Sequence, residues 1–167
     1  MSFKRILPKG KWIREFDFEL GAKVFFSITT DKYIVQLTGG SIIILDRNTK
    51  NELNRIRGYN YLYTGDVKPD ETEIIALENG KHFYVYSLED FLEKKRVTLP
   101  RGYEAIDVYG EYSSDGKLLY IPVYKYVGDG YKYCLCEYET ESYSLVNMKE
   151  IEQSEMFFWP LSYKDVL

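Results

Sequence analysis

The sequence of 167 residues has few groups that make cross-links or bind metals, with only two cysteines and one histidine. Cys134 and Cys136, on one face of an extended strand, would lie about 7 Å apart at Cα, too far for an easy disulfide. Together with the distant His82 they do not supply the four ligands of a structural zinc site. We therefore predict reduced, structural thiols, no metal centre and no cofactor.

Long apolar runs and an excess of positive charge are also absent. No stretch approaches the roughly 18 apolar residues of a membrane span, and the start MSFKRILPKGKW lacks the hydrophobic region of a signal peptide. Lysine and arginine number 22 against 26 acidic residues, for a net charge of −4. Because phosphate binding needs concentrated positive charge, nucleic acid is not expected as a partner. Because a membrane span and a signal peptide are not indicated, a membrane is not expected as a partner either, and the expected compartment is the cytoplasm.

Motifs of the common enzyme classes are missing. The chain contains no G-x-S-x-G, no P-loop and no G-x-G-x-x-G. His82 opens an apolar strand, which favours a structural role over that of a general base. Acidic pairs such as Glu89-Asp90 and Asp70-Glu71 fall in turns with no convergent partner, so solvated turns are favoured over a metal or acid–base site. No catalytic residue is assigned.

Apolar and aromatic residues are plentiful, at 45% hydrophobic and 17% aromatic, including 17 tyrosines. This composition excludes disorder, and the length suits one domain over residues 1–167. Short runs of Val, Ile, Tyr and Phe separated by Gly, Asn, Asp and Pro predict strands. The run Ile42-Ile43-Ile44-Leu45 is apolar on both faces, as in a strand between two other layers. Helix signals are confined to 87–95, with Ser87 as N-cap, and to 146–155.

The strand pattern repeats three times. Asp31, Asp70 and Asp115, spaced by 39 and 45 residues, each sit in a polar turn between two predicted strands. Two further predicted strands follow each of these strand pairs, so that each unit has four strands. The expected strands are 23–29, 33–37, 41–46 and 53–57; then 61–67, 73–77, 82–88 and 96–99; then 105–112, 117–126, 131–138 and 142–146. A period of this length with four strands per unit is typical of β-propeller blades.

The run Ser113-Ser114-Asp115-Gly116-Lys117-Leu118-Leu119-Tyr120 resembles the S-P-D-G-K-x-L turn of WD-repeat-like bacterial propellers, and Lys68–Ile75 resembles a second copy. The resemblance covers about 23–146. It departs from true WD repeats in lacking the Gly-His pair and the terminal Trp-Asp. It therefore implies a propeller-type fold and transfers no particular activity.

The chain ends carry additional strand signals, at 3–7 and 12–20, which read as a hairpin, and at 156–163. The predicted fold is all-β and propeller-like, with three full four-stranded blades plus terminal strands that form a partial or fourth blade. An incomplete arc of blades would expose unpaired strand edges and apolar faces to water. Either closure within the chain or a homodimer that completes a ring would cover them, and the sequence allows both. In either case we expect Phe157, Phe158 and Trp159 to be buried in a closing contact, either with the N-terminal hairpin around Trp12 and Phe16 or with a second chain.

Two similar loops are candidates for ligand binding. Arg57-Gly58-Tyr59 and Arg101-Gly102-Tyr103 lie 44 residues apart, each where one unit crosses to the next. Two Arg–Tyr pairs could bind an acidic or planar group through guanidinium and ring contacts. The structural alternative, which the sequence favours, is that glycine provides a positive φ, tyrosine packs on its neighbour and arginine is solvated.

A cluster of tyrosines in the third unit also allows two interpretations, as buried packing or as an exposed binding surface. The members are Tyr120, Tyr124, Tyr126, Tyr131, Tyr133, Tyr138 and Tyr143.

The predicted function is a non-catalytic interaction module for a protein partner or a second copy of the chain. The alternative is a small hydrolase or lyase that uses carboxylates in a propeller channel.

Overall fold

The computed structural model describes residues 23–37, 40–59, 62–64, 66–105 and 110–158, with the backbone alone at 23–28, 36–37, 62–64 and 156–158. Over these residues the strands form three sheets of four antiparallel strands each. In every sheet, strands that follow one another along the chain pair with one another. The all-β class and the three four-stranded units predicted from the sequence are confirmed.

The bounds of the strands follow the predicted units closely. The first sheet consists of β1 (Lys23–Ile28), β2 (Lys32–Leu37), β3 (Ser41–Asp46) and β4 (Glu52–Ile56). The second consists of β5 (Leu62–Thr64), β6 (Glu73–Glu78), β7 (His82–Ser87) and β8 (Glu93–Thr98). The third consists of β9 (Glu111–Tyr112), β10 (Leu118–Val127), β11 (Gly130–Glu139) and β12 (Leu145–Glu150).

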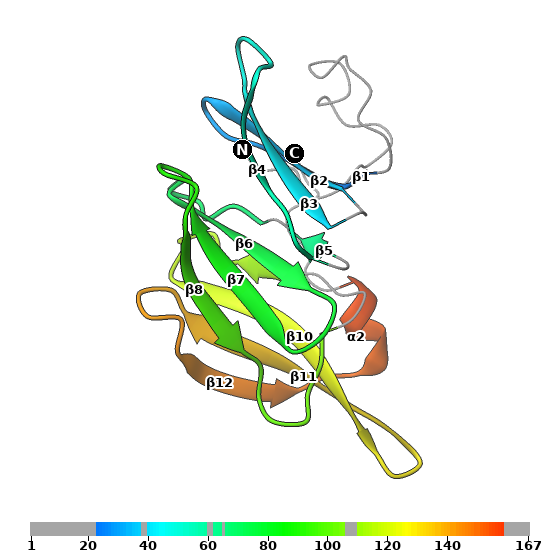
Figure 1. The fold of residues 1–167 in the computed structure, drawn as a ribbon. Helices are drawn as coiled ribbons and strands as arrows, with labels where there is room; N and C mark the ends of the chain where they lie inside the picture. Colours follow the sequence, from blue (N-terminus) through cyan, green and yellow to red (C-terminus); the bar gives the residue numbers. More distant parts are fainter. Residues whose placement is uncertain (1–22, 38–39, 60–61, 65, 106–109, 159–167) are drawn as a thin grey trace.

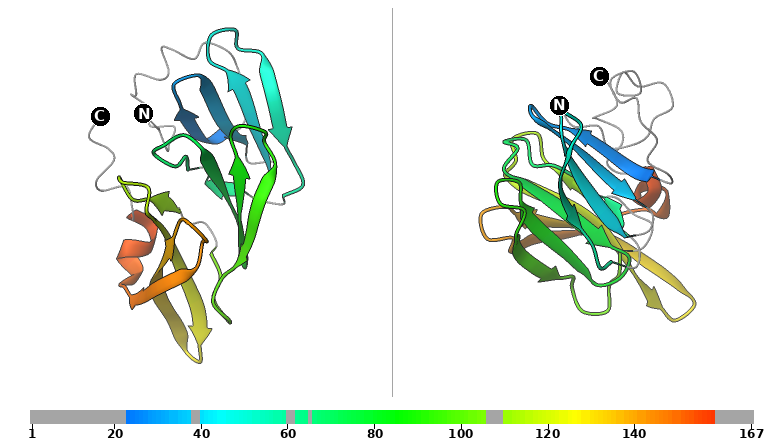
Figure 2. Two further views of the ribbon diagram at one scale, coloured as in Figure 1. Left: turned by 90° about the vertical axis from the view of Figure 1, so that its left-hand side faces the viewer. Right: turned by 45° about the horizontal axis from the view of Figure 1, so that its top comes forward.

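The sheets lie one behind another like the blades of a fan (Figure 1). The second sheet, in green, lies between the first, in blue and cyan, and the third, in yellow and orange (Figure 2). Helix α2 (Gln153–Phe158) lies beside the third sheet, on the side away from the second. No described helix is long and apolar enough to cross a membrane.

Apolar side chains of the second sheet pack in two directions. Ile74 and Ala76 of β6 belong to a core shared with the first sheet, whereas Ile75 and Leu77 belong to a core shared with the third. Because successive strand side chains point to opposite faces, a strand between two layers must be apolar at every position. All four residues are at most 1% exposed. The run 42–45 is likewise buried on both faces, as predicted.

The three aspartates lie in equivalent turns between the first and second strands of their sheets. Asp70 Oδ1 accepts hydrogen bonds from the backbone N of Thr72 at 3.0 Å and from its hydroxyl at 2.7 Å. Asp115 Oδ1 accepts one from Lys117 N at 3.0 Å. An Asx-type contact of this kind fixes a tight turn, which explains the aspartate in these two turns. In the first turn Asp31 accepts from the hydroxyl of Thr29 at 3.3 Å, and Thr29 accepts from the backbone N of Lys32 at 2.9 Å.

The turns between the third and fourth strands repeat as well, a feature that the sequence comparison missed. Each begins with a side chain that caps backbone N–H groups two and three residues ahead: Asp46, Ser87 and Glu139. In each sheet the register between the third and fourth strands also shifts by a bulge just before this residue. Because an aspartate, a serine and a glutamate accept the same pair of backbone hydrogen bonds, the repeat is hard to see in the sequence.

Four residues after each cap the backbone turns left-handed. Lys50, Phe91 and Tyr143 have φ values of 64°, 62° and 59°. This conformation is unusual for side chains larger than glycine and must be supported by tertiary contacts. Lys50 Nζ bonds the hydroxyl of Tyr33 at 2.7 Å, and the other two side chains pack against the two inter-sheet cores.

Three local predictions were wrong. Residues 87–95 form a turn and then β8, because left-handed Phe91 ends the single helical turn that Ser87 caps. The first half of the segment 146–155 belongs to β12, so the fourth strand of the third sheet lies later than predicted, and only the last three residues of the segment are helical, at the start of α2. The predicted strand 156–163 begins inside α2, where the carboxylate of Glu155 accepts from Glu152 N at 2.6 Å in a capping-box contact.

Candidate functional site

The two Arg-Gly-Tyr loops use their tyrosines to join neighbouring sheets. Gly58 and Gly102 have φ values of 105° and 85°, which a residue with a Cβ adopts only under strain. Tyr59, which follows the first sheet, lies 4.9 Å from the ring of Tyr84 between centroids and bonds the hydroxyl of Tyr86. It therefore packs on β7 of the next sheet.

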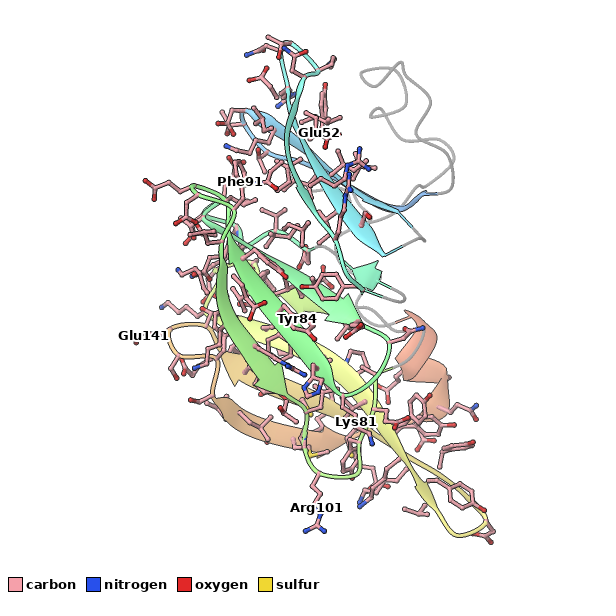
Figure 3. The ribbon with its side chains drawn as sticks, viewed as in Figure 1. Glu52, Lys81, Tyr84, Phe91, Arg101 and Glu141 are labelled. Atoms are coloured by element: carbon pink, nitrogen blue, oxygen red, sulfur yellow. The ribbon has the colours of Figure 1, made fainter. Side chains whose placement is uncertain are left out.

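The second loop repeats this arrangement one sheet further along. Tyr103 is 8% exposed, its hydroxyl accepts a hydrogen bond from Cys134 Sγ at 3.6 Å, and Lys125 Nζ lies 4.8 Å from its ring centroid. Arg57 and Arg101 are exposed, and Arg101 extends away from the sheets in Figure 3. Each tyrosine thus has a packing role, and binding of an acidic ligand by the two pairs stays a prediction.

A buried polar cluster fastens the second sheet to the third. The Tyr143 hydroxyl donates to Glu73 Oε2 at 2.5 Å and lies 2.7 Å from the hydroxyl of Tyr112. Lys94 Nζ donates to Glu73 Oε1, and Lys68 Nζ lies 3.8 Å from Oε2. Glu73 and both tyrosines are buried. A buried carboxylate is costly unless it is paired in this way, so we assign the cluster a structural role.

The polar cluster brings together residues far apart in the chain. Glu73 and Tyr143 are separated by 70 residues, and Tyr112 N also donates to Asp66 Oδ2 at 2.7 Å. Burial and the neighbouring Glu73 carboxylate raise the pKa of Tyr143 well above the usual value for tyrosine. The sequence gives no sign of this network, because each member looks like an ordinary strand or turn residue.

Among the described residues, the most exposed aromatic surface lies on the hairpin formed by β10 and β11. Tyr126 lies opposite Tyr131 in the register, and Tyr124 lies opposite Tyr133. Directly opposed residues of an antiparallel pair share one face, so these four rings form one group, here called the tyrosine face. Tyr126 is 66% exposed and Tyr131 is 56% exposed. Tyr131 lies at the centre, with ring centroids 5.6 Å from Tyr124 and 5.7 Å from Tyr126.

The hairpin extends beyond the rest of its sheet (Figure 1). Strands β10 and β11 have 10 residues each, whereas their neighbours β9 and β12 have two and six. Glu104 supports its base through paired backbone hydrogen bonds with Tyr124, both at 2.9 Å. The tyrosines near the tip are therefore part of a paired hairpin and remain in contact with solvent.

A shallow cavity of about 370 Å³ opens beside the tyrosine face, with its lining residues drawn from the hairpin and from the second Arg-Gly-Tyr loop. These residues are Gly102, Glu104, Tyr124, Lys125, Tyr126 and Tyr131. Glu104 shares the face of Tyr124, because the two residues form an antiparallel bridge. Lys81 Nζ lies 3.6 Å from the Glu104 carboxylate. The cavity thus combines aromatic rings with the carboxylate of Glu104 and the side chain of Lys125.

A second cavity, of about 530 Å³, lies where turns of the first two sheets meet. Asp31, Glu71 and Glu89 contribute carboxylates to its lining. Glu71 accepts from Thr30 N at 3.1 and 3.0 Å, which ties the two sheets together. A hydrogen bond from Lys32 lowers the pKa of Asp31. A catalytic acid needs a raised pKa, so Asp31 does not fit that role.

The remaining predicted groups fall into structural positions. Cys134 and Cys136 are free and buried, as expected for structural thiols. His82 begins β7 and its ring contacts the hydroxyl of Thr98 at 3.2 Å. Among the described residues there is no cluster of three or more metal-binding side chains.

The predicted closing contact cannot be placed on the described part of the chain. Trp12, Phe16 and Trp159 lie outside the described residues, and Phe157 and Phe158 are described by their backbone alone. The contact stays a prediction.

Comparison with known proteins places the fold. No family model matches the chain, and no curated protein sequence is similar to it. The similar solved structures include "Structure of U3-55K", with 12% identity, and "Crystal structure of RRP9 WD40 repeats", with 13%. Both have a TM-score of 0.58, and each match covers 74% of this chain. The matches cover only 37% and 36% of the two solved chains, so this chain spans little more than a third of their length. The repeated sheets, the Asp turns and these likenesses together show that the chain has the fold of WD40-type propeller blades.

Proposed function

We propose that the chain is a non-catalytic interaction module that binds a protein partner through the tyrosine face of the β10–β11 hairpin. The observation that carries the proposal is the exposure of Tyr126 and Tyr131 on a hairpin that extends beyond its sheet. Tyrosine supplies a large, rigid contact area with a polar tip, and it is enriched where binding energy is concentrated. Packing alone does not require two large rings in water.

The described carboxylates do not favour the alternative of a hydrolase or lyase. Glu73 is held by lysine and tyrosine inside a sheet interface, and Glu71 caps a backbone N–H group. The pKa of Asp31 is lowered rather than raised. These are structural uses of carboxylates.

Self-association belongs to the same proposal. The terminal sheets of an arc have outer faces that a closed ring would cover, and a second copy of the chain could cover them in a homodimer. The aromatic residues predicted for this contact are Trp12, Phe16, Phe157, Phe158 and Trp159. The proposed compartment is the cytoplasm, where two free cysteines stay reduced.

Binding assays with matched variants test the proposal. The full chain and a Tyr126→Ser, Tyr131→Ser variant are used to capture partners, which are identified and then titrated directly. Leu53→Ser is the control, because Leu53 is 45% exposed on β4 of another sheet. We expect the double tyrosine variant to lose an identified partner that the control retains. Equal binding by all three proteins would contradict the proposed surface.

A further inference from the structure

The composition of the cavity beside the tyrosine face indicates the chemistry of its partner. We propose that the cavity receives the guanidinium group of an arginine from a partner protein, held between the rings of Tyr126 and Tyr131 and the carboxylate of Glu104. The proposal rests on the proposed function and adds the chemical class of the ligand. Its parts are the ring faces, the single carboxylate and the cavity of about 370 Å³.

Charge complementarity favours a cation over an anion or a neutral group. The cations of the hairpin are already engaged: Lys132 Nζ lies 2.9 Å from Glu150, and Lys125 Nζ lies over the ring of Tyr103. Glu104 is the carboxylate of the cavity lining, and the chain as a whole carries a net charge of −4. Ring faces and a carboxylate both attract positive charge.

The geometry suits arginine better than lysine. A guanidinium group is planar and weakly hydrated, so it can stack on a ring while its N–H groups reach a carboxylate. The fold already uses such a contact, since Arg96 Cζ lies 5.7 Å from the ring centroid of Tyr84. Gly102 has no side chain and leaves open space beside it. The cavity can therefore hold one arginine side chain with part of its aliphatic stem.

The competing contact within the chain is weak. Lys81 lies 3.6 Å from Glu104, and their side chains are 62% and 38% exposed. An exposed pair of this kind contributes little to stability, so an incoming arginine can replace it at small cost. Figure 3 shows Lys81 at the end of the molecule where the hairpin extends.

Titration with short peptides tests the proposal on the full chain. The probe is a flexible Gly/Ser peptide with one central arginine, and the matched control peptide carries citrulline, which keeps the shape but has no charge. We expect the citrulline peptide to bind at least about 3-fold more weakly, and Tyr131→Leu to weaken arginine binding by about 3- to 30-fold. Chemical shifts in an NMR titration report both the affinity and the residues involved.

Two charge variants separate local from global electrostatics. Glu104→Gln is expected to weaken arginine binding by about 2- to 5-fold. Glu89→Gln removes the same charge from the exposed turn after β7 and is expected to leave binding unchanged. Tyr126→Leu replaces Tyr131→Leu if the latter loses its folded spectrum.

Equal binding of arginine and citrulline peptides, or equal effects of the two charge variants, would overturn the proposal. Preferential binding of a neutral proline-rich peptide to the tyrosine face would also overturn it, but would leave the proposed function standing. If an identified protein partner binds equally well to the Tyr126→Ser, Tyr131→Ser variant, the proposed function itself fails. The two claims are thus distinguishable.

Discussion

Removal of one hydroxyl tests how the second and third sheets are held together. Tyr143→Phe keeps the ring, which lies 6.2 Å from that of Phe83 between centroids, and deletes the hydroxyl that donates to Glu73 and contacts the hydroxyl of Tyr112. A hydrogen bond to a charged group is worth about 1.5–3 kcal/mol. The residual pairing of Glu73 with Lys94 remains. We therefore expect the free energy of unfolding to fall by about 1.5–3 kcal/mol in urea titrations.

A matched variant and a double-mutant cycle control this experiment. Tyr126→Phe removes the hydroxyl of an exposed tyrosine and should change stability by less than about 0.5 kcal/mol. Tyr143→Phe and Glu73→Gln should be non-additive, because each removes one partner of the same contact. A cost for Tyr143→Phe no larger than that of the control would refute the structural role of the polar cluster.

Three further predictions concern titration and turns. Hydrogen bonds from Ser142 lower the pKa of Glu139 to about 2, so its stabilising contribution should be present above the unfolded value near 4.5 and be lost as pH falls towards 2; NMR titration and a Glu139→Gln variant measure this. Burial raises the pKa of Cys136 to about 12, so native protein should resist thiol reagents at pH 8 and react on unfolding. Gly102→Ala, at a φ of 85°, should cost about 1–2 kcal/mol in urea titrations, whereas a neutral effect would contradict the strain argument.

The sequence predicted the fold well because propeller blades leave a clear pattern. The centre of β6, Ile74–Leu77, is apolar on both faces, and this follows directly from its place between two layers. The Asp turns of the second and third sheets repeat the same residue because both use the same contact with the backbone two residues ahead. These features are local, so they can be read without tertiary information.

Tertiary contacts explain what the sequence did not predict. The turns capped by Asp46, Ser87 and Glu139 are equivalent in geometry but not in residue type. The Glu73–Tyr143 contact joins segments 70 residues apart, which no periodicity can indicate. The first helix signal failed because a turn capped by Ser87 begins like a helix, but left-handed Phe91 ends it after a single turn.

The candidate site was only partly predictable for a related reason. The repeated Arg-Gly-Tyr loops indicated a shared site, yet Tyr103 is used for packing. The tyrosine cluster allowed both a buried and an exposed interpretation, and the structure contains both: Tyr138 and Tyr143 are buried, whereas Tyr126 and Tyr131 face solvent. Tyr126 and Tyr131 are exposed because the β10–β11 hairpin is longer than the neighbouring strands β9 and β12, which therefore do not cover its tip.

Chemical modification of tyrosines with and without an identified partner tests the central claim most directly. N-acetylimidazole followed by mass spectrometry of peptides gives the extent of modification at each ring. In the free chain we expect Tyr126 and Tyr131 to react and Tyr33 and Tyr138 to be protected, in line with their exposure. Bound partner should protect Tyr126 and Tyr131. If their modification stays unchanged while the partner is bound, the tyrosine face is not the binding surface.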